Sequence, residues 1–102
     1  MSRNNTTIRE WISSYPEIEV FHMPITLPDR YGLEDWAELP HGTWKVNDIP
    51  DSILDKPFYP GYGTQRVPSF NAWSKDRVFF VNEYDGSVSL DYVLRNPREI
   101  TE

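Results

Sequence analysis

The chain has 102 residues, of which 38% are hydrophobic and 25% are charged, and this is enough for one folded domain. It contains no cysteine, which excludes disulfides, thiolate metal sites and cysteine nucleophiles. Sixteen acidic and ten basic residues give a net charge of −6, which argues against a nucleic acid or an anionic membrane as the main partner. No apolar run approaches the length of a membrane span, and the N-terminal stretch lacks the apolar segment of a secretory signal. We therefore expect a soluble cytoplasmic protein.

The first expected element is a helix over residues 5–15. Its apolar side chains recur at the helical spacing i, i+3, i+4 and i+7: Ile8, Trp11, Ile12 and Tyr15. Asn5, Thr6 or Thr7 can supply the N-cap oxygen, and Pro16 stops the run. A helix this short is not stable alone in water, so its apolar stripe must dock on another element.

Short elements separated by prolines follow this helix. Residues 17–25 predict a strand, and residues 33–39 predict one or two amphipathic helical turns. Residues 42–46 predict a short strand and residues 51–55 a single capped turn. Residues 56–68 are rich in Pro, Gly and Tyr and predict an ordered loop.

The last third of the chain predicts an antiparallel meander of three strands, 69–74, 77–84 and 87–94. Two-residue turns at Lys75-Asp76 and Asp85-Gly86 join them, and Asp-Gly is typical of a type I′ hairpin. These turns place six apolar side chains on one face: Phe70, Ala72, Phe79, Val81, Leu90 and Tyr92. A one-residue slip would scatter that set over both faces. The expected fold is therefore a small single α+β domain, a β-meander packed against the N-terminal helix, with one or two further short strands.

No sequence motif for catalysis is present. The chain has no phosphate-binding loop, no zinc-protease motif and no nucleophile elbow. Its two histidines, His22 and His41, show no metal-ligand spacing. We expect no catalytic residue, no metal and no cofactor, and a minor hydrolase or metal enzyme remains the third hypothesis.

The leading hypothesis is a non-catalytic binding protein of the inhibitor or immunity type. The acidic excess between residues 29 and 51 is either a solvated face or a surface that attracts a basic protein partner. The rings of the 56–66 loop either cover the sheet or form a stiff contact patch. The candidate partner-binding residues are exposed aromatics with flanking charges: Phe58, Tyr59, Tyr62, Arg66, Trp36, Trp44, Asp35 and Glu38.

The second hypothesis is a binding protein for a nucleotide or another planar metabolite. The meander face opposite the core mixes rings, amides and a carboxylate, and its candidate ligand-binding residues are Trp73, Phe80, Asn71, Asn82 and Asp91. The protein's own loops cover this face, or it is exposed. We also expect one meander edge to recruit the 17–25 strand and the other to stay free, which would permit a homodimer by strand addition or the binding of a partner in the same way.

Overall fold

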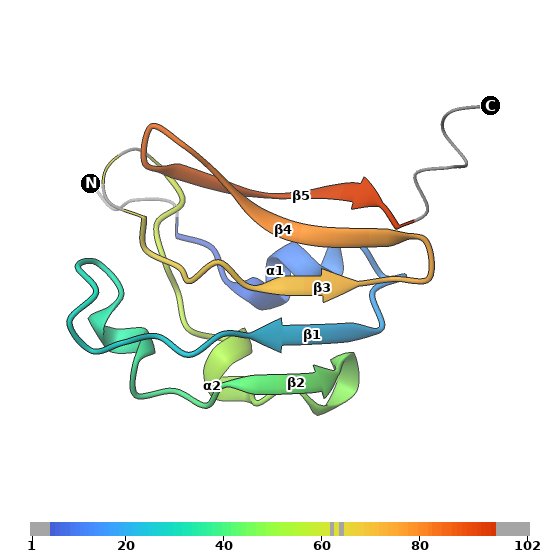
Figure 1. Ribbon diagram of the computed structural model, residues 1–102, viewed down its shortest axis with the longest axis horizontal. Coiled ribbons are helices and arrows are strands. Elements are labelled where there is room, and N and C mark those ends of the chain that lie inside the picture. The colour runs from blue at the N-terminus through green and yellow to red at the C-terminus, as the bar shows by residue number, and fades with distance from the viewer. Residues whose placement is uncertain (1–4, 62, 64, 96–102) are drawn as a thin grey trace.

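The fold is a five-stranded antiparallel sheet with helices behind one face, and it belongs to the α+β class as predicted (Figure 1). The computed structural model describes residues 5–61, 63 and 65–95. The strands are β1 (Val20–Met23), β2 (Gly42–Lys45), β3 (Asn71–Trp73), β4 (Arg77–Tyr84) and β5 (Ser87–Leu94). The helices are α1 (Ile8–Ser13) and α2 (Asp51–Leu54), with the 3-10 turns η1 (Glu34–Trp36) and η2 (Val46–Asp48).

Helix α1 is shorter than the predicted range 5–15. Thr7 is its N-cap and accepts a hydrogen bond from the backbone N–H of Glu10. Thr6 lies outside the helix because its N–H and C=O pair with those of Phe58, both at 2.9 Å. This long-range bridge draws the first residues away from the helix, and sequence periodicity does not reveal it.

The meander is confirmed in its turns and in its register. Asp85 and Gly86 have φ values of 54° and 84°, as a type I′ turn requires. Four predicted cross-strand pairs are present: Glu83↔Val88, Val81↔Leu90, Phe79↔Tyr92 and Ala72↔Phe79. β3 is shorter than the predicted strand 69–74, so the ladder does not include Phe70, which the same turn would pair with Val81. The other two-residue turn closes with a hydrogen bond from the N–H of Ser74 to the carbonyl of Arg77.

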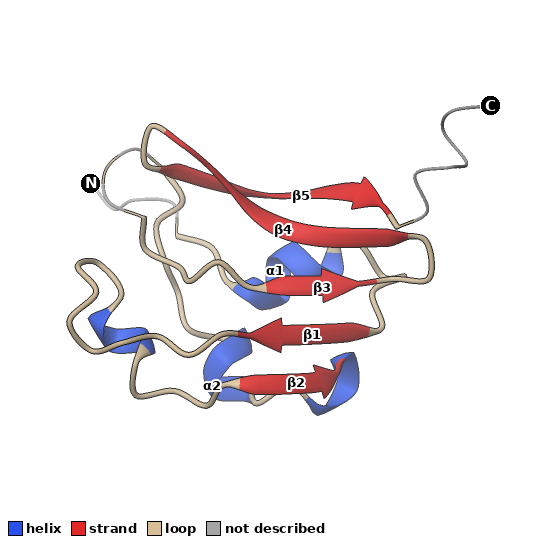
Figure 2. Ribbon diagram, in the orientation of Figure 1, coloured by secondary structure: helices blue, strands red, loops and turns tan. Residues whose placement is uncertain are grey.

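The two short N-terminal strands extend the meander into a sheet of order β2-β1-β3-β4-β5. Strand β1 pairs with β3 on one side and with β2 on the other, and all of these pairs are antiparallel (Figure 2). β1 ends before Pro24, which has no N–H to donate to a ladder. The predicted strand 17–25 is therefore present but shorter, and β5 lies at the opposite edge of the sheet.

The core lies between the helices and the inner face of the sheet. Ile8 and Ile12 from α1 and Ile53 and Leu54 from α2 belong to one buried cluster with the strands. Phe70, Ala72 and Phe79 are fully buried, and Tyr92 shares their face but stays 38% exposed because β5 is an edge strand. In the described part of the chain, no helix is long and apolar enough to cross a membrane.

The outer face of the sheet carries no helix among the residues that the structure describes. α1 and α2 both lie behind the sheet in Figure 1, so the outer face points toward the viewer. Trp73 and Phe80 lie on this face, because their chain neighbours Ala72 and Phe79 point into the core. Both rings are partly buried. No helix in the described chain covers this platform, and its two rings are partly exposed.

Candidate functional site

A concave site of about 470 Å³ lies at one end of the sheet, where the segments 31–36 and 56–59 meet Asn5, which precedes α1, and Arg66. We call it the end pocket. Figure 1 places these two loop segments at the same end of the molecule. The pocket is lined by Asn5, Tyr31, Gly32, Glu34, Asp35, Trp36, Lys56, Pro57, Phe58, Tyr59 and Arg66. Five of the eight predicted partner-binding residues are therefore brought together.

Two buried rings build the floor of the end pocket. Trp36 is 5% exposed, and its Nε1–H donates to the carbonyl of Arg66 at 2.9 Å, which ties η1 to the loop. Phe58 is 4% exposed and lies edge-on to Trp11, with ring centroids 5.0 Å apart. The prediction that these two rings are exposed is wrong, because the small domain uses them in its core.

The pocket lining carries both signs of charge. Asp35, whose side chain is 86% exposed, and Glu34, which accepts the N–H of Gly32 at 3.0 Å, are its acidic residues, and Lys56 and Arg66 are its basic residues. Lys56 Nζ lies 3.8 Å from Asp35 Oδ2 and 5.7 Å from the centroid of the Trp36 ring. Lys56 therefore interacts with both the Asp35 carboxylate and the Trp36 ring, and the Asp35 side chain stays largely exposed to solvent.

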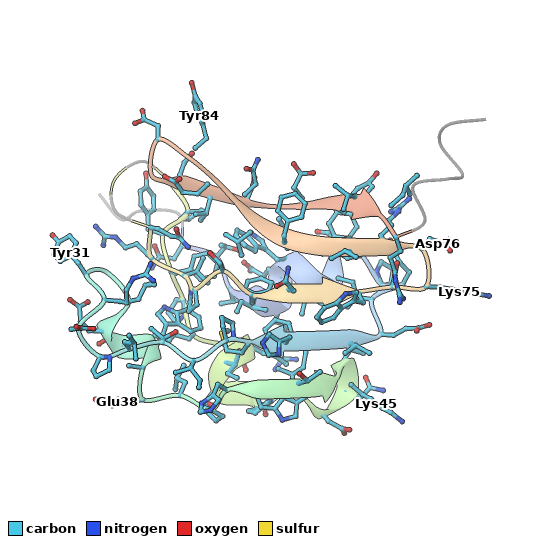
Figure 3. All side chains as sticks on the ribbon, in the orientation of Figure 1. Tyr31, Glu38, Lys45, Lys75, Asp76 and Tyr84 are labelled. Carbon is cyan, nitrogen blue, oxygen red and sulfur yellow. The ribbon has the colours of Figure 1, made fainter. Side chains whose placement is uncertain are left out.

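The rim of the pocket carries two tyrosines. Tyr31 is 79% exposed and extends away from the body of the protein (Figure 3). The Tyr59 ring packs directly on Gly61, where an added Cβ would collide with it. The Pro60 carbonyl accepts a 2.8 Å hydrogen bond from the N–H of Val88, which anchors this loop to β5.

The remaining predicted partner-binding residues are not at the end pocket. Trp44 lies in β2 and stacks on Phe21, with centroids 6.4 Å apart, so it packs against the core. Glu38 is exposed outside the pocket lining (Figure 3). Tyr62 lies outside the described residues.

Sequence reasoning missed Tyr31, Glu34 and Lys56 as pocket residues. Tyr31 is followed by Gly32, which has a φ of 87°. An aromatic residue beside a glycine was the available signal, because glycine favours turns and turns run over the protein surface. The nearness of Lys56 to Asp35 depends on a contact between segments 21 positions apart, which no local pattern encodes.

The five alternative ligand-binding residues all lie on the outer sheet face. Asn71 pairs with Phe80, which pairs with Asp91 on the next strand. Two of the three polar groups are already engaged, since Asn71 Nδ2 donates to the Phe79 carbonyl at 3.3 Å and Asp91 Oδ1 accepts from the Tyr92 N–H at 2.9 Å. Fewer groups therefore remain to recognise a ligand edge than the sequence suggested.

The two histidines of the chain do not line the end pocket. His22 Nδ1 lies 2.8 Å from Thr43 Oγ1 across β1 and β2, an ordinary cross-strand contact, and His41 is exposed. Among the described residues, no group of three or more His, Cys, Asp or Glu could hold a metal ion. The clear pKa shifts belong to Arg9 and Asp55, which do not line the end pocket.

In comparisons with known proteins, no family model, no curated protein and no solved structure matches this chain. The geometry of its own residues is therefore the basis for a function.

Proposed function

We propose that this protein is a non-catalytic binding protein that holds a segment of a protein partner in the end pocket. The observation that carries the proposal is the convergence of Asp35, Trp36, Phe58, Tyr59 and Arg66, which belong to segments far apart in the chain, around one concave volume of about 470 Å³. A concave site with a rigid aromatic floor and a few convergent polar groups is the common form of a binding pocket.

The exposed acidic side chain of the pocket favours a partner segment that presents a basic side chain. The Asp35 carboxylate is 86% exposed and can pair with a lysine or arginine of the partner. Tyr31 offers a large exposed ring in the same pocket lining, and aromatic anchors of this kind often dominate binding energy. Such a protein would act by occupying its partner, as inhibitors and immunity proteins do.

The test compares two tyrosines of nearly equal exposure. Tyr31 at the pocket is 79% exposed and Tyr84 at the tip of the β4–β5 hairpin is 76% exposed (Figure 3). Peptides are selected from a random library on the wild-type protein, and their dissociation constants are then measured with Tyr31→Ala, Tyr84→Ala and Asp35→Lys. We expect Tyr31→Ala to weaken binding at least about tenfold, the range of a buried aromatic anchor, while Tyr84→Ala leaves it unchanged.

Asp35→Lys adds a test of the charge preference. We expect the selected peptides to be rich in lysine or arginine and to lose affinity with this variant, while its thermal midpoint stays close to that of the wild type. Equal effects of Tyr31→Ala and Tyr84→Ala, or a failure to select any peptide, would contradict the end pocket as the binding site.

The outer sheet face supports a second candidate, the binding of a planar metabolite. Trp73 and Phe80 lie there without a covering helix in the described chain. The test is the shift in thermal midpoint caused by a nucleotide. An equal shift for wild type and Tyr31→Ala, with no shift for Trp73→Ala, would favour this face over the end pocket as the binding site.

A further inference from the structure

Strand β5 leaves one side of its backbone open. The N–H of Arg95 donates to the Asp76 carbonyl beside β4, whereas the N–H of Val88 donates outward to the Pro60 carbonyl. Backbone groups in an antiparallel strand alternate between the two sides. The N–H and C=O groups of Leu90, Tyr92 and Leu94 therefore point to the outer edge, where no described strand pairs with them.

This open stretch is also apolar. Tyr92, Val93 and Leu94 are consecutive, and they are 38%, 54% and 39% exposed. The opposite edge of the sheet, β2, is only four residues long and ends with Lys45 (Figure 3), two features that discourage strand pairing. The start of β5 is covered by the loop through Pro60. A pairing surface is thereby confined to the second half of β5.

We propose that β5 pairs antiparallel with β5 of a second copy of this chain, with the two-fold axis at Val93. In this register Tyr92 of each copy faces Leu94 of the other, and these residues exchange their outward N–H and C=O groups. The two sheets join into one continuous sheet. The inference goes beyond the proposed function, since none of these residues lines the end pocket.

Charge complementarity favours this register, and it favours a second copy of the chain as the strand that pairs with β5. With the axis at Val93, Asp91 of each copy lies opposite Arg95 of the other on the outer face, at a close-spaced pair of the ladder. An axis at Asp91 would place two carboxylates opposite each other, and an axis at Tyr92 would place Asp91 opposite Val93. The strand is therefore complementary to itself in the chosen register.

The distribution of charge also permits this contact. Residues 52–102, which include β5, carry seven acidic and six basic residues, whereas residues 1–51 carry nine and four. The half of the chain that forms the interface has a net charge of −1, and the other half has −5. The part of the sequence that contributes β5 therefore carries less of the acidic excess than the N-terminal part.

One change within each copy accompanies pairing. Asp91 Oδ1 accepts the outward N–H of Tyr92 at 2.9 Å, so the carboxylate shields this donor in the single chain. In the dimer the Leu94 carbonyl of the second copy takes that N–H, and Asp91 is released to pair with Arg95. Because both copies use the same strand, the contact is isologous and closes at two chains.

The first test is sedimentation velocity of the full chain over a range of concentrations. We expect a reversible monomer–dimer equilibrium for the wild type. Asp91→Arg and Arg95→Asp each place like charges opposite one another twice, so each weakens the dimer about tenfold or more, and the double variant restores it. Restoration by the double variant separates pairing from folding, because Arg95 Nη1 also donates to the Ser74 carbonyl.

The second test removes only an outward N–H. Leu94→Pro deletes a donor that the β4–β5 ladder does not use, whereas Leu94→Ala removes a similar amount of side chain and keeps the donor. We expect Leu94→Pro to abolish the dimer and Leu94→Ala to weaken it less, both with the wild-type circular dichroism spectrum. A wild type that stays monomeric at its highest soluble concentration would overturn the proposal. So would a dimer that neither Leu94→Pro nor the charge reversals affect.

Discussion

At the scale of single residues, two glycines decide how the pocket loop sits on the β4–β5 hairpin. Gly86 has a φ of 84°, and a Cβ at this position would collide with the backbone of Gly63. Gly63 itself has a φ of 121°, but a Cβ there would meet nothing. The two positions share the requirement for positive φ and differ in steric contact, so they form a matched pair.

Gly86→Ala is expected to destabilise the protein more than Gly63→Ala. Each substitution places a Cβ in a backbone conformation that costs about 1–3 kcal/mol. At Gly86 the collision is with backbone, which cannot rotate away as a side chain can, and it adds at least about 1 kcal/mol of overpacking. Urea unfolding of both variants measures the difference in free energy of unfolding, and equal losses would show that the loop does not rest on the hairpin.

The sequence alone could not predict which aromatic rings of the site are buried. Trp36, Phe58 and Asp35 were predicted as partner-binding residues and line one pocket, yet the sequence could not show that Trp36 and Phe58 are buried in the core. The Nε1–H of Trp36 reaches the carbonyl of Arg66, 30 positions away. Burial depends on such distant contacts, while composition shows only that large rings are numerous.

At the scale of elements, the two helices are too short to be stable alone and must be held from outside. α1 has six residues and α2 has four. Arg9 of α1 binds Asp55, the C-cap of α2, through Nε at 2.6 Å and Nη2 at 3.0 Å, and it also reaches Asp51 at 3.1 Å. This bidentate contact ties the helices together above their shared core.

The Arg9–Asp55 pair makes stability depend on acid pH. The hydrogen bonds from Arg9 lower the pKa of the Asp55 carboxyl. A lowered pKa in the folded state means that the stabilisation is complete above the ordinary aspartate pKa of about 3.9 and is lost as the pH falls through the folded-state value. We therefore expect the thermal midpoints of wild type and Asp55→Asn to differ at pH 6 and to converge below pH 4.

Asp48→Asn is the control for this measurement, because Asp48 is exposed and makes no ion pair in the described part of the chain. Its thermal midpoint is expected to follow that of the wild type at every pH. High salt is expected to reduce the Asp55 difference, since the pair is exposed to solvent. A constant difference between wild type and Asp55→Asn down to pH 2 would refute the assigned role.

The elements were predicted well where local chemistry determines them. Asp85-Gly86 specified a turn type and, through it, the register of β4 and β5. Helix α1 was predicted in the right place with the wrong ends, because the bridge between Thr6 and Phe58 joins residues 52 positions apart. A two-residue turn is determined by adjacent residues and can be predicted from them, whereas the ends of short helices depend on tertiary contacts.

At the scale of the whole molecule, one buried cluster connects every layer. Residues from both helices and from the strands belong to it, including Ile53 of α2 and Phe79 of β4. In the described chain the helices lie on one side of the sheet, and the buried cluster lies between them and its inner face (Figure 2). Loss of packing at any point in the cluster should therefore lower the free energy of unfolding of the whole domain, which unfolds in one cooperative transition.

Ile53→Ala tests this cooperativity at a site distant in sequence from the meander. Ile53 is 0% exposed, so the truncation is expected to cost about 2–5 kcal/mol of the free energy of unfolding. Ile25→Ala is the matched control, because Ile25 is 66% exposed and its truncation should change stability by no more than about 0.5 kcal/mol. Urea unfolding followed by tryptophan fluorescence and by far-ultraviolet circular dichroism should give coincident, shifted curves for Ile53→Ala. Separate transitions for the two probes would mean that α2 and its neighbours unfold apart from the sheet, and the single cluster would then not act as one core.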